Sequence, residues 1–152
     1  MRRILIACFC LIATAAGAAD WTVPQRGSAT RAALMDAIRP HAEWELGQPV
    51  EFVVKELRVA GDLGFAMLKA QRPGGVPIDM RDTPIARRGG FDADIAEAAE
   101  LQVLYRKSGQ TWVAVHWMIG ATDPWFTWEP LCREYAPVIH DWCAQRPVLS
   151  NE

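Results

Sequence analysis

The sequence has no cluster of charge of one sign. Its 16 Lys and Arg residues and 18 Asp and Glu residues are dispersed along 152 residues, and the formal net charge is −2. Proteins that bind nucleic acid gather Lys and Arg on one face, because each contact neutralises a phosphate. The composition therefore argues against a nucleic-acid partner.

Histidine is scarce, and the three residues stand singly at His41, His116 and His140. Neither a His-x-x-x-His spacing nor a His-Glu dipeptide occurs, so the sequence predicts no metal site. A Gly-x-Ser-x-Gly elbow, a phosphate-binding glycine loop and a dinucleotide fingerprint are also missing. We therefore expect no cofactor, and no familiar enzyme class is indicated.

The only long apolar run lies at the N-terminus. Arg2 and Arg3 precede the apolar residues 4–13, and small residues follow as far as Ala19. A basic, an apolar and a small-residue region in that order are typical of a secretory signal peptide, and the apolar run is shorter than the roughly 20 residues of a membrane span. We expect cleavage after Ala19, which makes 1–19 a cleaved signal peptide and leaves no stable membrane span.

The remaining residues, 20–152, are enough for a single α+β domain but too few for two. We expect this domain in the periplasm or outside the cell. Lipidation at Cys8 is an alternative fate, because Leu5-Ile6-Ala7-Cys8 resembles a bacterial lipobox. The apolar segment before Cys8 is, however, shorter than the roughly seven residues that a signal needs.

Cysteine is rare in the expected mature chain, where only Cys132 and Cys143 remain. An exported protein with one pair of cysteines most simply forms a disulfide. On one straight helix the two Cα atoms would lie about 16 Å apart, whereas a disulfide requires less than about 7 Å. The chain must therefore reverse between them, and Pro137 is the natural break. Two buried free thiols are the alternative.

Apolar residues recur at helical spacing from about Thr30 to Leu46, with Ser28 or Thr30 as the N-cap. Pro40 removes a backbone donor inside this segment, so we expect a kink or two abutting helices. The next part is strand-like at 50–60 and 64–71, with a turn at Gly61-Asp62.

A turn-rich segment at 73–91 follows, which is either functional or poorly ordered. Two further strands are predicted at 98–106 and 111–119. The last strand is apolar on both faces, which favours a central place in the sheet with a cover on each side. Its expected second cover is the C-terminal tail, 125–142.

Together these elements predict an N-terminal helix, kinked at Pro40 and packed on a curved antiparallel sheet of about four strands, with a disulfide-linked C-terminal helical tail. That order resembles the cystatin-like and nuclear-transport-factor-2-like (cone) folds. The chain also resembles uncharacterised exported bacterial proteins over roughly 30–128. The motifs are Ala37-Ile38-Arg39-Pro40, the strand 50–54 and Ile119-Gly120-Ala121-Thr122-Asp123. The resemblance implies architecture and not a reaction.

His116 is the candidate catalytic residue, because it lies mid-strand where a general base in a cone-shaped pocket would lie. Asp123 follows the strand and is the candidate partner that would orient the imidazole. The alternative interpretation makes His116 a hydrogen-bonded structural residue and Asp123-Pro124 an ordinary turn opening.

Aromatic residues concentrate near the end of the sequence, and the candidate binding residues are Trp112, Trp125, Phe126 and Trp128. Aromatic platforms stack on sugars and apolar ligands, so these residues predict a glycan or another small molecule as the ligand. The alternative is that these rings fill the core.

Three functions are compatible with these observations. The first is an exported binding or interaction module that contacts an unknown protein or small-molecule ligand through 73–91 or the Trp-rich segment. The second is a small cone-fold enzyme that uses His116 and Asp123 in an apolar pocket. The third is a homodimeric structural or regulatory protein, in which the second apolar face of 111–119 is the dimer interface.

Overall fold

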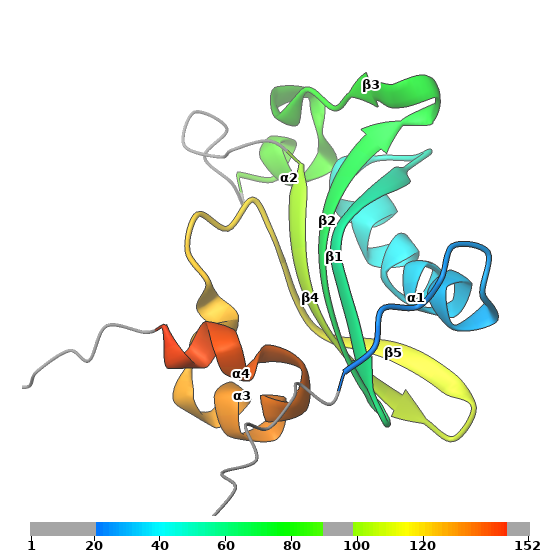
Figure 1. Cartoon of the computed structure of the whole chain (residues 1–152). Helices are drawn as coiled ribbons and strands as arrows, with labels where there is room; N and C mark the ends of the chain where they lie inside the picture. Colours follow the sequence, from blue (N-terminus) through cyan, green and yellow to red (C-terminus); the bar gives the residue numbers. More distant parts are fainter. Residues whose placement is uncertain (1–20, 90–98, 146–152) are drawn as a thin grey trace, which may run out of the picture.

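The computed structural model describes residues 21–89 and 99–145 (Figure 1). The fold is α+β, and the predicted signal peptide lies outside the described residues. No helix in the described part of the chain has the length and apolar character needed to cross a membrane. The elements in chain order are α1 (Ala29–Leu46), β1 (Glu51–Ala60), β2 (Leu63–Arg72), η1 (Pro73–Gly75), β3 (Val76–Pro77), η2 (Met80–Asp82), α2 (Pro84–Arg87), β4 (Glu100–Ser108), β5 (Thr111–Ile119), η3 (Trp125–Thr127), α3 (Glu129–Glu134) and α4 (Ala136–Ala144).

Helix α1 begins and ends at defined caps. The Ser28 hydroxyl accepts a hydrogen bond from the Arg31 amide at 3.3 Å, as expected for an N-cap. Gly47 ends the helix with φ 77°, and the Arg72 guanidinium donates to the carbonyl oxygen of Leu46 at 2.8 Å. Pro40 lies within α1, which continues through it as one helix rather than two.

The sheet is antiparallel, in the order β1-β2-β4-β5, and the two-residue strand β3 pairs with β2 as a fifth strand. Two hairpins, β1–β2 and β4–β5, therefore lie side by side through the β2–β4 ladder. The strands bend along their length (Figure 1). One hairpin turn falls at the predicted Gly61 and the other at Gly109, and both glycines adopt positive φ.

Each face of the sheet has its own core. Figure 1 shows α1 and the tail helices α3 and α4 on different sides of the sheet. On one face α1 buries a stripe at helical spacing, consisting of Leu34, Ile38, Ala42 and Leu46. It packs against strand residues such as Leu68, Val103 and Tyr105. On the other face the tail, η3 to α4, packs Phe126 and Tyr135 against Phe65 and Leu104. The tail therefore covers the centre of the sheet, and α1 covers the opposite side.

The prediction that 111–119 is a central strand covered on both sides is wrong. β5 lies at the end of the strand order, and its second face is exposed at Val113, Val115 and Met118. Helix α4 of the tail packs mainly on β1 and β2, and the tail reaches β5 at His116, whose ring meets Tyr135. A strand that is apolar on both faces is normally covered on both sides, so the exposed valines of β5 are unusual.

The side chains of 111–119 do not alternate strictly between the two faces of the sheet. The pairing register shifts between Leu104 and Tyr105, where Leu104 faces His116 and Tyr105 faces Ala114, so Val115 is an extra residue. This β-bulge puts Trp112, Ala114 and Ile119 into the same core, although their positions differ in parity. Strict alternation along the sequence cannot reveal such a shift.

The segment 73–91 is built into the fold as far as residue 89, the last described residue before the gap. Ile78 and Met80 are buried in the α1 core. The Thr83 hydroxyl donates to the Met80 carbonyl oxygen at 2.6 Å and accepts from the Ala86 amide at 3.3 Å. Ile78, Met80 and Thr83 are therefore packed into the fold at one end of the sheet, whereas residues 73–77 are exposed.

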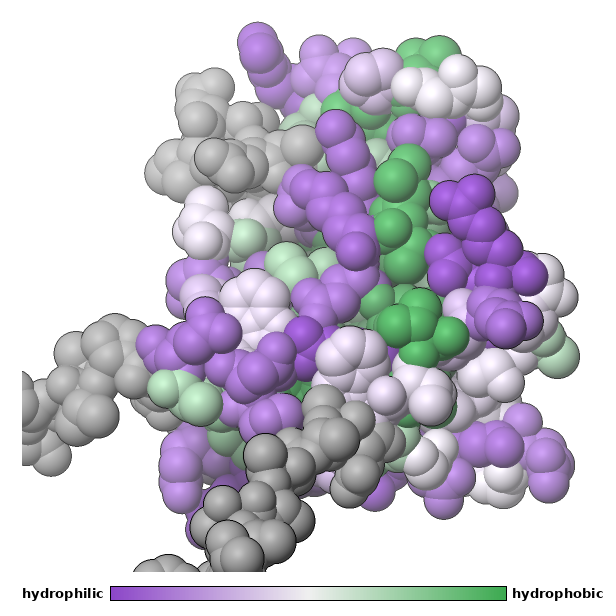
Figure 2. Space-filling model, viewed as in Figure 1, coloured by the Kyte–Doolittle hydropathy of each residue, from purple (hydrophilic) through white to green (hydrophobic). Residues whose placement is uncertain are grey.

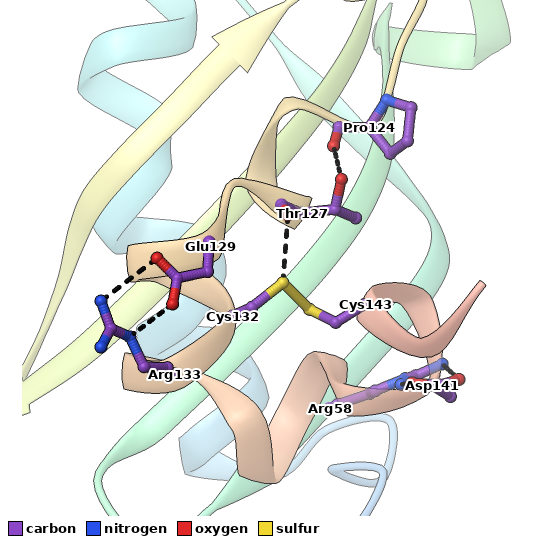
Figure 3. The surroundings of a disulfide bond; sticks show 8 residues. All are labelled: Arg58, Pro124, Thr127, Glu129, Cys132, Arg133, Asp141 and Cys143. Carbon is purple, nitrogen blue, oxygen red and sulfur yellow. Dashed lines mark hydrogen bonds and ion pairs between the residues drawn. A yellow bond between two sulfur atoms is a disulfide. The ribbon is translucent and has the colours of Figure 1, made fainter. Parts of the chain in front are cut away.

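The predicted disulfide is confirmed. Cys132 of α3 and Cys143 of α4 are bonded, with Cα atoms 6.0 Å apart (Figure 3). The chain reverses at Tyr135, and Pro137 occupies the first turn of α4, where a missing amide proton is harmless. The Cys132 sulfur also lies 3.1 Å from the Thr127 carbonyl oxygen, a contact without a proton because a disulfide sulfur carries none.

Candidate interaction surface

The structure does not bring His116 and Asp123 together. In the described ranges no hydrogen bond or ion pair joins them, and Asp123 is an exposed turn residue whose carbonyl oxygen accepts from the Trp125 amide at 2.9 Å. The His116 ring instead meets the edge of Tyr135, with ring centroids 6.2 Å apart. The predicted acid–base pair therefore lacks its second member.

Tyr135 does not replace Asp123 as a partner that could take up a proton. Its side chain is buried in the tail core, and burial, followed by the nearby Glu134, raises the pKa of its hydroxyl. Arg106 lies over the Tyr135 ring and pairs with Glu134 at 2.6 Å. At neutral pH the described residues around His116 offer it a neutral phenol and no carboxylate in hydrogen-bond contact.

The four candidate aromatic residues do not form one platform. Trp112 is buried on the α1 side of the sheet, whereas Phe126 is fully buried on the tail side. Trp125 is partly buried beside Phe126, with ring centroids 6.0 Å apart. Only Trp128 is open to solvent, with 61% of its surface exposed. The packing interpretation accounts for the other three.

The described residues give little support to a metal site or to a site in the hollow beside the N-terminal segment. No group of three or more metal-ligating side chains occurs within 21–89 and 99–145. An open hollow of about 290 Å³ is lined by Thr22, Pro24, Gln25, Ser28, Thr30 and Val59. The hydroxyls of Thr22 and Ser28 are bonded to the backbone at Val59 and Arg31, so the hollow presents few uncommitted polar groups.

The best-defined exposed apolar feature is the edge strand β5. Val113, Val115 and Met118 are 43%, 42% and 43% exposed, and we call these three residues the β5 surface. Elsewhere among the described residues the large exposed apolar side chains are single, as at Val23 and Val76, and the exposed Trp44 lies against the Arg88 guanidinium. Single apolar residues on a surface are ordinary, but several exposed apolar residues on one edge strand are not.

The opposite edge of the sheet differs in character. Figure 2 shows a narrow apolar strip, bounded on both sides by hydrophilic side chains, where β1 and β2 run in Figure 1. β1 carries Glu51, Lys55, Glu56 and Arg58, and its end pairs with the N-terminal segment through the bridge between Thr22 and Val59. Charges and a covering segment are the usual protection of an edge strand, and β1 has both.

Comparison with known protein families, with curated proteins and with solved structures gives no match for this chain. The likeness to cystatin-like and cone folds therefore stays a prediction. The apolar second face of 111–119 is visible in the sequence, but the tail that was expected to cover it leaves Val113, Val115 and Met118 exposed. The signal that points to an exposed edge is the absence of any charged residue from Thr111 to Ile119.

Proposed function

We propose that this chain is an exported interaction domain whose contact surface is the β5 surface. The observation that carries the proposal is the exposure of Val113 and Val115 on a strand whose outer edge pairs with no other described strand. The open side of an edge strand presents a row of amide and carbonyl groups that can hydrogen-bond with another strand. The exposed side chains add apolar area to that contact.

Export is part of the proposal and is supported by the disulfide. A bond between Cys132 and Cys143 persists in an oxidising compartment and is rare where thioredoxin and glutathione keep thiols reduced. The order of basic, apolar and small residues in 1–19 also supports export from the cytoplasm.

The experiment compares native complexes in extracts of cells that export the protein. We expect the natural protein to migrate above the size of one chain, and Val115→Lys to migrate as one chain, because a lysine on the contact strand would have to be desolvated on pairing. Val53→Lys is the matched control, since Val53 is 44% exposed on the protected edge strand β1. Migration of the natural protein as a single chain would contradict the proposal.

A further inference from the structure

The nine residues of β5 combine features that promote strand pairing. The segment Thr111–Ile119 contains four β-branched residues and two tryptophans, and it has no charge, no proline and no glycine. Such composition is typical of segments that pair with another strand when their edge is open. Natural edge strands usually carry a lysine, a proline or an inward-pointing charge against this, and β5 has none.

The bulge at Val115 is the one protective device on β5, and it acts alone. On β1 the register shift falls at Lys55, so the bulge there places a charged residue at the irregular position. On β5 the extra residue is an exposed valine. The two edge strands therefore differ in their protection. A charged bulge residue protects the outer edge of β1 from pairing, and β5 has no such charge.

Charges flank β5 in a way that selects its partner and its direction. Lys107 precedes the β4–β5 turn and the exposed Asp123 follows the strand, whereas Arg106 is already paired with Glu134. When two copies of β5 pair antiparallel about a twofold axis, the basic end of each copy lies beside the acidic end of the other. Parallel pairing would put like ends together, which is unfavourable.

We infer that the occupant of the β5 surface is β5 of a second copy of this chain, paired antiparallel to give a homodimer with one sheet continuous through both copies. The inference rests on the proposed function and adds the identity of the partner. A twofold contact uses the same surface on both copies, so the outer edge of β5 is paired in each copy and the assembly stops at two chains. An uncharged strand suits an uncharged partner, and β5 itself is such a strand.

The test measures the mass of the purified, disulfide-bonded protein by light scattering over a range of concentrations. We expect a reversible dimer for the natural protein and for Val53→Lys. Val115 is the central residue of Thr111–Ile119, so in an antiparallel pair of β5 strands it lies near the twofold axis, close to Val115 of the other copy. For Val115→Lys we therefore expect the dissociation constant to rise by at least about tenfold, because two like charges would lie close together there. Mixing Val115→Lys with Val115→Glu should restore a dimer, since the charges are then opposite.

A second measurement needs no variant. In the natural protein, amide hydrogen exchange within 111–119 should slow as the protein concentration rises, while exchange within 51–60 stays constant. Exchange in 111–119 that is independent of concentration, or a Val115→Lys dimer as stable as the natural one, would overturn the inference. If the purified protein is monomeric but the native extract contains a larger complex sensitive to Val115→Lys, the partner is another protein. In that case the proposed function stands and the self-pairing is wrong.

Discussion

Arg58 of β1 and Asp141 of α4 are 83 residues apart in the sequence and form a two-point ion pair, with Nη1–Oδ1 2.5 Å and Nη2–Oδ2 2.9 Å (Figure 3). The same Nη1 donates to the Val138 carbonyl oxygen at 3.0 Å. Trp21 lies over the guanidinium, 4.6 Å from ring centroid to Cζ. Arg58 therefore ties the N-terminal segment, the sheet and the disulfide-bearing tail together at one point.

Asp141→Asn should destabilise the protein in a pH-dependent way. Hydrogen bonds from Arg58 hold the pKa of Asp141 below its ordinary value of 3.8. A depressed pKa in the folded state stabilises the fold above the unfolded pKa, and this stabilisation disappears as the pH falls through the folded pKa. Since Asp141 is 40% exposed, we expect a loss of only about 1 kcal/mol at pH 7.

Urea denaturation at pH 7 and near pH 3 measures this difference. Glu129→Gln is the control, because Glu129 and Arg133 form an ion pair on the exposed surface of α3 that should contribute little at either pH. An equal loss for Asp141→Asn at both pH values would show that the carboxylate charge is not what stabilises the contact.

Replacing both Cys132 and Cys143 by serine should lower the free energy of unfolding by about 2 to 3 kcal/mol, because the bond closes a short loop in the unfolded chain. Intact mass before and after reduction checks that the natural protein gains two hydrogens. Denaturation under oxidising conditions then compares the two proteins. Equal stability of the double variant and the natural protein would contradict this expectation.

Tyr105→Phe should be neutral or slightly stabilising. The Tyr105 side chain is fully buried, and its hydroxyl has no hydrogen-bond partner among the described residues. An unpartnered buried hydroxyl has given up its bonds to water, so its removal recovers about 1 kcal/mol at most. A loss of more than about 1 kcal/mol on thermal denaturation would mean that the hydroxyl bonds to something in solution.

The same residue predicts a difference at alkaline pH. Burial raises the pKa of Tyr105 in the folded state. Above the ordinary tyrosine pKa of about 10 the unfolded chain ionises while the folded one does not, so stability falls as the pH rises. The natural protein should therefore lose stability above pH 10 faster than Tyr105→Phe, and parallel curves would contradict this.

The exported protein should begin at Asp20. Sequencing the N-terminus of protein isolated from the envelope or the medium tests this, and Ala19→Arg should block processing because the signal peptidase site accepts small residues. An unprocessed N-terminus in a protein that remains in the cytoplasm would refute export, and with it the proposed compartment.

Local patterns in the sequence were enough to predict the secondary structure around the core. The helix that ends at Leu46, the turn at Gly61 and the strands predicted at 50–60 and 64–71 depend on spacing and on turn chemistry alone. The pairing of Cys132 with Cys143 followed from there being only two cysteines in the expected mature chain. Each of these inferences uses residues that lie close together in the sequence, or a set too small to be ambiguous.

The order of the strands and the cover of each face were decided only by the tertiary structure. Apolar residues on both faces of 111–119 look the same in the sequence whether the strand is central or at an edge. The difference depends on where the tail packs. The tail packs on Phe65 and Leu104 at the centre of the sheet, and it accepts a hydrogen bond from Arg58 of β1. Those contacts join residues up to 83 positions apart, so no local pattern records them. The sequence therefore contained the apolar strand, and the packing of distant segments left it exposed.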